Sequence, residues 1–412
     1  HDYWRNPPAF QKRGKVGGVA RAMISLEAAQ ARLVALASPL PLQTVPLADA
    51  TGRWSADDVY SKRTQPARAL SAMDGYAMAG GSVGPWRVIG ESAAGRPFAG
   101  RVGDGEAARI FTGAAVPHGA DAVVIQENIV RDGNIIRVAP ADVPITGRHI
   151  RQQGSDFRAG DLLIKNGDRL MPAQVALAAG GGYDQLTVRR RPRVALIATG
   201  DELVAPGVDA GDDFLPESNT TMLAGLLDEL KCDIRRIGII PDNLSEIVAA
   251  IRAADADLLI TLGGASVGDH DLVRPALEAC GAKLDFWKVA MRPGKPVMAG
   301  QLGNMLVLCL PGNPVSAFVT ALLFAKPVAA ALAGANAPLA RQFTVRVAAP
   351  LPANGERIDH LRARNTVAGV VPVGPNDSAS LGGLAGADCL IVRPPNAPAA
   401  DIGDTVPIYI LD

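Results

Sequence analysis

The sequence predicts a multi-domain protein of α/β and β structure, with a parallel α/β sheet, an inserted N-terminal β domain and a C-terminal β-barrel-like domain. Residues 194–325 alternate apolar strands with amphipathic helical segments, a pattern typical of a parallel sheet covered by helices. Residues 60–144 and 341–412 instead contain short apolar runs between Gly, Pro and Asp turns, which favours β domains. The 412 residues, 48% of them hydrophobic, are enough to form several cores.

The N-terminal part predicts one domain that is interrupted by another. Residues 1–21 are polar, and we expect them to be disordered. Residues 24–38 place apolar side chains on one helical face after the capping residue Ser25, and a second helix is expected at 172–179. Because these helical segments flank a β region, we interpret that region as an insertion. The predicted domains are a linker domain formed by residues 22–59 and 145–190, an inserted β domain at 60–144, an α/β domain at 191–335 and a C-terminal β domain at 341–412.

Composition and charge exclude several classes of protein. The 41 basic and 41 acidic residues balance, whereas nucleic-acid and anionic-membrane proteins carry a basic excess. The four cysteines are far apart and form no CxxC pair, which indicates reduced thiols and a cytoplasmic location. The apolar run 315–334 is long enough to span a membrane, but Lys326 and Pro327 interrupt it. We therefore expect a buried helix that ends or kinks at Pro327.

Three polar loops follow apolar strands of the predicted parallel sheet, at the edge where such sheets bind ligands. They are residues 199–202, 263–271 and 310–316. Glycine lets a backbone approach an anion closely, and a helix N-terminus offers free N–H groups, so the second and third loops are candidate phosphate cradles. A tight turn without a ligand would explain either loop taken alone, whereas two such loops in one sheet favour a ligand that carries phosphate.

Charged residues of both signs lie at the same strand ends. Carboxylates there suit Mg²⁺, which prefers oxygen ligands shared with substrate phosphates, although Asp242 and Asp269 could equally cap the helices that follow. Three cations within residues 288–295 can neutralise an oxyanion or a pyrophosphate, or form a solvated basic turn. The acidic residues are Asp201, Glu202, Asp242, Asp269 and Asp271, and the cations are Lys288, Arg292 and Lys295.

Eight segments carry a resemblance to a known family. They are SAMDGYAM (71–78), IFTGAAVPHGADAVVIQE (110–127), HIRQQGSDF (149–157), RPRVALIATGDEL (191–203), ESN (217–219), DLLITLGGASVGDHD (257–271), FWKVAMRPGKP (286–296) and LPGNPVSA (310–317). Together and in this order they resemble the molybdopterin molybdenumtransferase family, which includes bacterial MoeA and the gephyrin E region. The resemblance extends over residues 22–412.

The resemblance implies a four-part subunit that works as a homodimer, with each active site between the α/β domain of one chain and N-terminal parts of the other. It implies insertion of molybdenum from molybdate into adenylylated molybdopterin, with release of AMP and molybdenum cofactor and with support from Mg²⁺. The expected partners are these two substrates, a second copy of the chain and the molybdopterin adenylyltransferase. Neither nucleic acid nor a membrane is expected.

The resemblance also implies roles for individual residues. Metal binding is expected for Asp201, Glu202, Asp242 and Asp271, which also belong to the catalytic group. The full catalytic group is Asp74, Thr112, Asp156, Asp201, Glu202, Asp242 and Asp271. Substrate binding is expected for Gly263, Gly264, Ser266, Lys288, Arg292, Lys295, Pro311, Asn313, Ser316, Arg362 and Ser378. Within that set, the first six would bind the pyrophosphate, and Arg362, Ser378, Pro311 and Ser316 would surround molybdate.

Three departures from the family pattern bear on these roles. Arg292 stands where lysine is common, which keeps the charge but replaces a point donor with a planar fork. Glu217 stands where aspartate is usual, and the segment 357–362 is atypical of the last domain. Two alternative functions remain open. One is an adenylyltransferase, which has a related α/β module but lacks the SAMDGYA domain, and the other is a non-catalytic scaffold of the gephyrin type.

Overall fold

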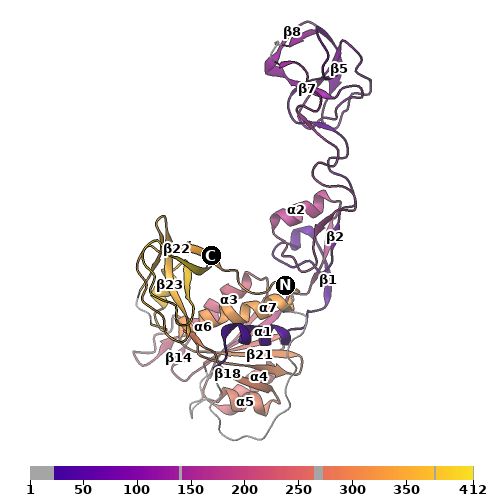
Figure 1. Cartoon of the computed structure of the whole chain (residues 1–412). Coiled ribbons are helices and arrows are strands. Elements are labelled where there is room, and N and C mark those ends of the chain that lie inside the picture. The colour runs from indigo at the N-terminus through magenta and orange to yellow at the C-terminus, as the bar shows by residue number, and fades with distance from the viewer. Residues whose placement is uncertain (1–22, 139–141, 264–271, 375–376, 412) are drawn as a thin grey trace.

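The computed structural model describes residues 23–138, 142–263, 272–374 and 377–411 (Figure 1). An α/β domain carries the C-terminal β domain on one side, and on the other a small linker domain leads into an extended arm that ends in the inserted β domain. This architecture confirms the predicted fold class. The predicted segment 1–21 and the predicted residues Gly264, Ser266, Asp269 and Asp271 lie outside the described residues.

A six-stranded sheet forms the centre of the α/β domain. Four strands are parallel, whereas β20 and β18 are added antiparallel at one edge. Strand β20 was not predicted, and it is antiparallel because the tight turn at 303–304 joins it directly to β21. In spatial order the strands are β16 (Asp233–Ile240), β13 (Arg193–Thr199), β17 (Leu258–Leu262), β21 (Met305–Leu310), β20 (Pro296–Leu302) and β18 (Lys283–Lys288).

Helices cover both faces of this sheet, because alternate residues along each strand point to opposite sides. Val194 and Leu196 pack in a core with α1, α3, α6 and α7, whereas Ala195 and Ile197 pack in a second core with α4 and α5. The helices are α1 (Leu26–Leu36), α3 (Asn219–Asp228), α4 (Leu244–Ala253), α5 (Val273–Ala279), α6 (Pro314–Thr320) and α7 (Lys326–Leu332).

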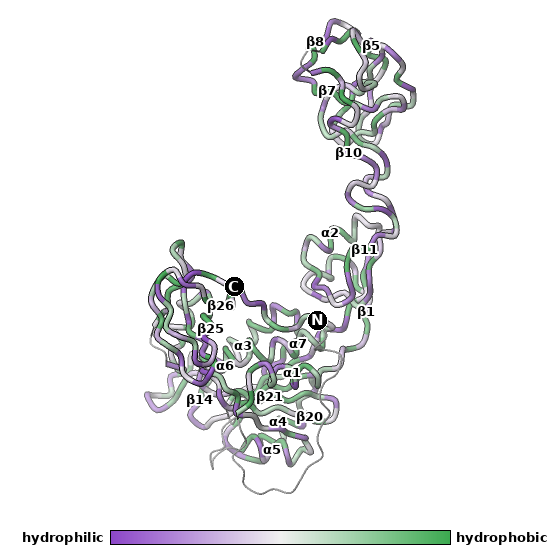
Figure 2. Tube along the Cα trace, in the orientation of Figure 1, coloured by the Kyte–Doolittle hydropathy of each residue, from purple (hydrophilic) through white to green (hydrophobic). Residues whose placement is uncertain are grey.

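The linker domain is built from two-stranded pairs, whereas the inserted domain contains a six-stranded sheet. Two neck segments, residues 61–69 and 152–160, join the linker domain to the inserted domain and are mostly hydrophilic (Figure 2). The linker domain contains β1 (Leu42–Pro46), β2 (Val59–Tyr60), β11 (Leu162–Ile164), α2 (Pro172–Gly180) and β12 (Gln185–Arg189). The inserted domain has β3 (Leu70–Ser71) paired with β10 (Ile150–Arg151), and a sheet ordered β7 (Ala122–Ile125), β4 (Gly75–Met78), β6 (Glu106–Ile110), β5 (Trp86–Ser92), β9 (Ile135–Val138) and β8 (Ile129–Asp132).

The C-terminal sheet borrows a strand from the α/β domain. Its edge strand β19 (Met291–Arg292) lies between β18 and β20 in the sequence but pairs with β23 (Ile358–Thr366). The remaining strands are β25 (Cys389–Arg393), β26 (Thr405–Ile410), β22 (Phe343–Arg346) and β24 (Gly369–Pro372), with the short helix α8 (Leu381–Ala385) beside them. A separate pair, β14 (Leu203–Val204) and β15 (Leu215–Pro216), extends from the α/β domain.

The long apolar helix predicted from the sequence is buried. Helix α6, a π turn at Ala321–Ala325 and α7 form one continuous helix, 314–332, which is long and apolar enough to cross a membrane, yet 89% of its most apolar window is buried inside the protein. Of the two predicted alternatives, an end at Pro327 is wrong, because the helix continues to Leu332. The π turn directly before Pro327 is the kind of irregularity that lets a helix accept a proline.

Gln30 of α1 completes this proline-containing helix. An α-helix would satisfy the carbonyl of Leu323 with the N–H four residues later, but that residue is Pro327, which has none. The buried side chain of Gln30 donates from Nε2 to the Leu323 carbonyl at 2.9 Å instead. A residue near the N-terminus therefore supplies a hydrogen bond in place of the i→i+4 bond that Pro327 cannot make.

Replacing Gln30 with Met should destabilise the protein by about 1–3 kcal/mol, because the substitution keeps the side-chain volume but removes the side-chain donor to the buried Leu323 carbonyl. Urea unfolding measures the change. The control is Arg32→Met on the exposed face of the same helix, which should shift the unfolding midpoint little. Equal shifts for the two variants would contradict this role of Gln30.

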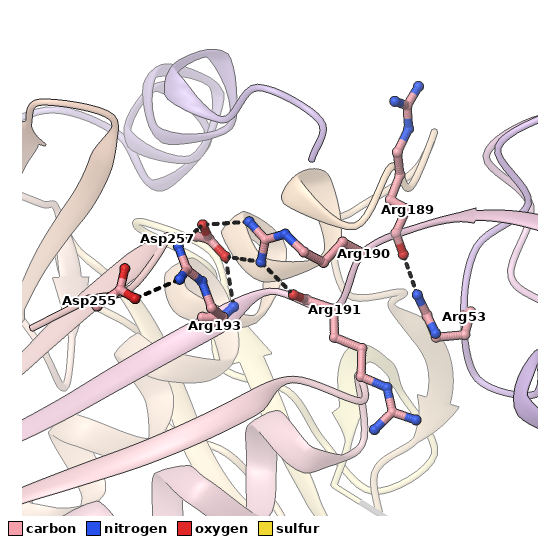
Figure 3. A network of polar contacts seen from close by, with 7 residues as sticks. All are labelled: Arg53, Arg189, Arg190, Arg191, Arg193, Asp255 and Asp257. Carbon is pink, nitrogen blue, oxygen red and sulfur yellow. Dashed lines mark hydrogen bonds and ion pairs between the residues drawn. The ribbon is translucent and has the colours of Figure 1, made fainter. Parts of the chain in front are cut away.

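An arginine-rich network fastens the linker domain to the α/β domain (Figure 3). Asp257, at the start of β17, accepts hydrogen bonds from Nη1 and Nη2 of Arg190, both at 2.8 Å, and from the backbone N–H of Arg193 at 2.8 Å. Arg193 also pairs with Asp255 at 2.8 Å, and Arg53 of the linker domain donates to the carbonyl of Arg189. Burial alone would raise the pKa of Asp257, but the hydrogen bonds from Arg190 and Arg193 outweigh it and hold that pKa below its ordinary value.

Replacing Asp257 with Asn should cost on the order of 2 kcal/mol of stability at neutral pH. A carboxylate whose pKa is lower in the folded than in the unfolded protein stabilises the fold above its unfolded pKa of about 3.9, and the stabilisation is lost as the pH falls through the folded value. The thermal midpoints of wild type and variant should therefore differ at pH 7 and converge in acid. Asp255→Asn, at a side chain that is 79% exposed, should show little difference at either pH. If the thermal midpoints of wild type and Asp257→Asn differed by the same amount at every pH, the stabilising role of the charged Asp257 carboxylate would be refuted.

Candidate active site

The carboxyl ends of the parallel strands lie at one edge of the sheet, here named the rim and formed by residues 199–202, 241–243, 263, 288–295 and 310–316. Because β20 and β18 are antiparallel to their neighbours, β20 begins and β18 ends at this same edge. Neighbouring strands lie about 4.8 Å apart, so the rim measures roughly 24 Å from the end of β16 to the end of β18. Strand order therefore fixes the order of chemical groups along the rim.

Carboxylates occupy the end of the rim that follows β16 and β13. Asp201 Oδ1 accepts the backbone N–H of Asp242 at 2.9 Å, which ties together the loops after two neighbouring strands. The Glu202 carboxylate folds over Gly200, where an added Cβ would lie 2.6 Å from one of its oxygens. All three acidic side chains are exposed. The structure thus brings Asp201, Glu202 and Asp242 to one end of the rim.

Glycine backbone forms the middle of the rim, after β17 and β21. Gly263 has a φ of +94°, and an added Cβ there would lie 2.8 Å from the carbonyl oxygen of Thr199. A Cβ at Gly312 would lie 3.7 Å from the Cα of Gly263, so the two loops are in contact. Asn219, at the start of α3, donates to the Gly312 carbonyl at 2.6 Å. A surface without side chains lets phosphate oxygens come close to the main chain.

The C-terminal domain contacts the rim at the loop after β21. Asn313 Nδ2 donates to Ser378 Oγ at 3.1 Å, and the N–H of Val315 donates to the Ser378 carbonyl at 2.9 Å. Pro311 is half-buried beside this contact. Ser316 is only 5% exposed, inside the first turn of α6, so it offers little surface to a ligand. Asn313 and Ser378, far apart in the sequence, are therefore held together.

Arg362 is buried within the C-terminal domain. Its Nη1 donates to the carbonyl of Ser380 at 2.8 Å, and Gly383 of α8 packs so closely that an added Cβ would lie 2.9 Å from the same nitrogen. Arg362 as a whole is only 4% exposed. Arg362 thus supports the segment that carries Ser378.

The opposite end of the rim carries the cations. Residues 288–295, here named the cation loop, are closed by a hydrogen bond from the N–H of Val289 to the Lys295 carbonyl at 2.9 Å. Within the described ranges, Lys288 and Lys295 make no ion pair. Arg292 does, and its partner is Asp359 of the C-terminal domain. Acidic and basic groups thus lie at opposite ends of one edge, with backbone between them.

The inserted domain holds a second group of predicted residues. Asp74 Oδ1 accepts hydrogen bonds from the backbone N–H of Thr112 at 2.7 Å and from the Thr112 hydroxyl at 2.8 Å. These two hydrogen bonds, of which the backbone one has the larger effect, hold the pKa of Asp74 below its ordinary value. Asp156 lies in the neck, where it is exposed beside a cleft of about 440 Å³. Within one chain the arm keeps the inserted domain far from the rim (Figure 1).

Asp359 was missed from the sequence, and Glu217 has a structural role. Asp359 is 3% exposed in a strand, opposite Arg292 on one side and Arg393 on the other. An acid inside a β segment is the signal that could have identified it. Glu217 is buried and accepts the N–H and the hydroxyl of Thr220, at 2.8 and 2.5 Å, so it caps the start of α3. It does not join the exposed carboxylates of the rim.

The acidic end fits a magnesium ion that is shared with a phosphate. Among the residues that the structure describes, no three His, Cys, Asp or Glu side chains gather into a ready-made metal site. Mg²⁺ is commonly held by one or two carboxylates together with substrate phosphate oxygens, so it does not need such a cluster. Asp201 keeps one carboxylate oxygen that is not used by Asp242, and Glu202 lies beside it.

Replacing Gly263 with Ala should destabilise the protein more than replacing Gly281 with Ala. Both glycines have positive φ, +94° and +87°, so both substitutions strain the backbone by about 1–2 kcal/mol. Only at Gly263 does the new Cβ also meet another backbone atom, whereas at Gly281 nothing lies within 4 Å. Chemical unfolding of the two variants isolates the effect of that contact. Equal losses of unfolding free energy for Gly263→Ala and Gly281→Ala would show that the loops of the rim are not packed as described.

Known protein families and solved structures are similar to this chain over most of its length. Three family models match: the MoeA N-terminal region (domain I and II) over residues 24–182, the probable molybdopterin binding domain over 195–331 and the MoeA C-terminal region (domain IV) over 344–411. A molybdopterin molybdenumtransferase of Haemophilus influenzae is 37% identical over 76% of this chain and 78% of its own, and molybdopterin molybdenumtransferase 2 of Mycobacterium tuberculosis is 33% identical over 89% and 95%. The crystal structure of a molybdopterin biosynthesis moeA protein of Pyrococcus horikoshii superposes with a TM-score of 0.79 at 25% identity and covers 95% of this chain and 100% of its own. The chain therefore belongs to the molybdopterin molybdenumtransferase family, whose members are enzymes of molybdenum cofactor biosynthesis.

Proposed function

We propose that this enzyme inserts molybdenum from molybdate into adenylylated molybdopterin and releases AMP and molybdenum cofactor. The observation that carries the proposal is the single rim, on which carboxylates, glycine backbone and cations follow one another along the sheet. A pterin joined to a nucleotide through a diphosphate is an extended ligand, so different parts of it can contact these groups at once. A small ligand could not reach both ends of an edge of roughly 24 Å.

The acidic end and the glycine backbone suit the diphosphate. Gly263 and Gly312 let its oxygens approach the main chain, while Asp201 and Glu202 would hold Mg²⁺ against them. Bound there, Mg²⁺ would neutralise charge on the phosphoanhydride and favour its hydrolysis. Asp242, tied to Asp201 through its backbone, lies where a carboxylate can orient the attacking water.

The cation end suits molybdate. Three strand spacings, roughly 14 Å, separate the ends of β13 and β20, so the carboxylates and the cation loop would contact different parts of the ligand. Molybdate is a dianion, and carboxylates nearby would repel it. We therefore assign molybdate to Lys288, Arg292 and Lys295, with Ser378 and Asn313, which are held together at the loop after β21, as candidate neutral donors. This revises the expectation that the same cations bind the pyrophosphate.

The proposal includes a homodimer and a cytoplasmic location, with substrate delivered by a molybdopterin adenylyltransferase. Asp74, Thr112 and Asp156 cannot reach the rim of their own chain, because they lie along the arm (Figure 1). A second copy would bring these residues to the rim from outside. The four cysteines, all within the described residues, form no disulfide, which is consistent with a reducing compartment.

Release of AMP from adenylylated molybdopterin, measured with and without molybdate, tests the reaction. Asp201→Asn combined with Glu202→Gln should lower the molybdate-dependent rate by about 10²-fold or more, because the metal-binding carboxylates are lost. The matched control is Asp212→Asn with Asp213→Asn, two exposed acids in the loop after β14, which should leave the rate unchanged. If the wild type released no AMP either with or without molybdate, the result would favour a non-catalytic scaffold and contradict the proposed reaction.

Mixing two inactive variants tests the homodimer. If Asp74 of one chain serves the rim of the other, co-expression of Asp74→Asn with Asp201→Asn should restore about a quarter of wild-type activity, because half of randomly paired dimers are mixed and each contains one intact site. Each variant expressed alone is the control. Activity that stays at the level of the single variants would show that the two residues do not share a site between chains.

A further inference from the structure

We infer that Asp359 is a positioning residue, which fixes Arg292 of the cation loop in the orientation that receives molybdate. The inference rests on the proposed function, because it takes molybdate as the ligand of that loop. It assigns to the C-terminal domain a part in ordering the site of the α/β domain.

Backbone pairing first brings the two residues together. Strand β19 pairs in parallel with β23, with Met291 opposite Ile358 and Arg292 opposite Asp359. The N–H of Ile358 donates to the carbonyl of Ala290 at 2.9 Å. Part of the cation loop is therefore an edge strand of the C-terminal sheet, and its backbone cannot move independently of that domain.

The rest of the cation loop is fixed by its contact with α6. Gly294 has a φ of +97°, and an added Cβ would lie 2.4 Å from Cγ2 of Thr320, so the loop is pressed onto α6. With the backbone held on both sides, the remaining freedom of Arg292 lies in its side-chain torsions. A long side chain of this kind loses considerable rotamer entropy when it is ordered by a ligand.

Asp359 removes that freedom in advance. Arg292 donates from Nε to Asp359 Oδ2 at 3.1 Å and from Nη2 to the same oxygen. The side chain of Asp359 is 4% exposed, whereas that of Arg292 is 49% exposed. The carboxylate therefore lies behind a half-exposed guanidinium, whose Nη1 makes no hydrogen bond to any residue that the structure describes and remains available to an anion.

The hydrogen-bond geometry between Arg292 and Asp359 differs from that of an ion pair in which both carboxylate oxygens are used. Both donors converge on Oδ2, while the buried Oδ1 has no partner within the described ranges. A fork-to-fork pair would satisfy both oxygens and turn the guanidinium fully toward the carboxylate. The observed arrangement leaves Oδ1 unsatisfied and directs part of the guanidinium outward, which is how a buried anchor orients a ligand-binding cation.

The other two cations of the loop have no such anchor. Lys288 and Lys295 make no ion pair in the described part of the chain. Pre-orientation improves binding because less freedom is lost when the ligand arrives. Of the three cations, Arg292 is thus the one whose direction the fold determines.

Two measurements on the homodimer test the inference: direct binding of molybdate by calorimetry, and the kcat and KM of molybdate-dependent AMP release. Asp359→Asn keeps the side-chain shape and removes the charge, so it should weaken molybdate binding and raise its KM by about tenfold with little change in kcat. Asp388→Asn, directly before β25 and at the opposite end of that strand from the residue paired with Asp359, is the matched control. Its carboxylate accepts the N–H of Asn365 and contacts the Cys389 thiol, so the substitution should change neither quantity.

Coupling separates positioning from a general effect on the fold. In an Arg292→Met background, Asp359→Asn should produce no further loss of molybdate affinity, whereas in a Lys295→Met background its tenfold effect should persist. The conservative Asp359→Glu should recover part of the affinity, which also covers the case in which the Asn variant does not fold. An equal loss in both backgrounds, or a lower thermal midpoint with unchanged KM and affinity, would overturn the inference.

Failure of the proposed function gives a different result. In that case the wild type would show no molybdate-dependent release of AMP and no molybdate binding. If the wild type binds and turns over molybdate but the Asp359 variants behave like Asp388→Asn, only the positioning role is refuted.

Discussion

The order of strands in one mixed sheet is the constraint on which the rest of the structure depends. Hydrogen-bonded strands lie about 4.8 Å apart, so the loops that follow them are spaced along the rim at multiples of that distance. Carboxylates follow β16 and β13, glycines follow β17 and β21, and cations lie between β18 and β20. The two antiparallel strands matter here, because they bring the cation loop to the edge where the parallel strands end. Attraction between the acidic and basic groups would otherwise neutralise both, and separation along the sheet keeps each available to a different part of the ligand that we propose.

Segments remote in sequence hold this rim in place. The C-terminal domain supplies Ser378 to the loop after β21 and Asp359 to the cation loop, while α1 supplies Gln30 to the helix beneath them. On the opposite edge of the sheet, Asp257 and its arginines fasten the linker domain, from which the arm extends (Figure 3). The rim and the anchoring edge are thus opposite edges of the sheet, so the attachment of the arm does not crowd the rim.

The sequence was most informative where local chemistry and position coincide. Asp201 and Gly263 could be identified because each directly follows an apolar strand, and the parallel core was predictable from strands that are apolar on both faces. Strand β20 was missed because it begins at a proline inside a motif that suggested a basic loop. Gln30, the side-chain donor to the Leu323 carbonyl, is 293 residues away from it, and Asp359, the partner of Arg292, is 67 residues away. Pairings of this kind depend on tertiary packing, which periodicity does not encode.

Hydrogen exchange on the full-length protein, with and without adenylylated molybdopterin and molybdate, tests the central claim most directly. If one extended ligand lies along the rim, peptides that cover 199–204, 288–296 and 310–316 should all exchange more slowly when it is bound. The segment 251–257, at the anchoring edge, should be unaffected. Protection confined to one end of the rim, or protection at the anchoring edge instead, would contradict the account.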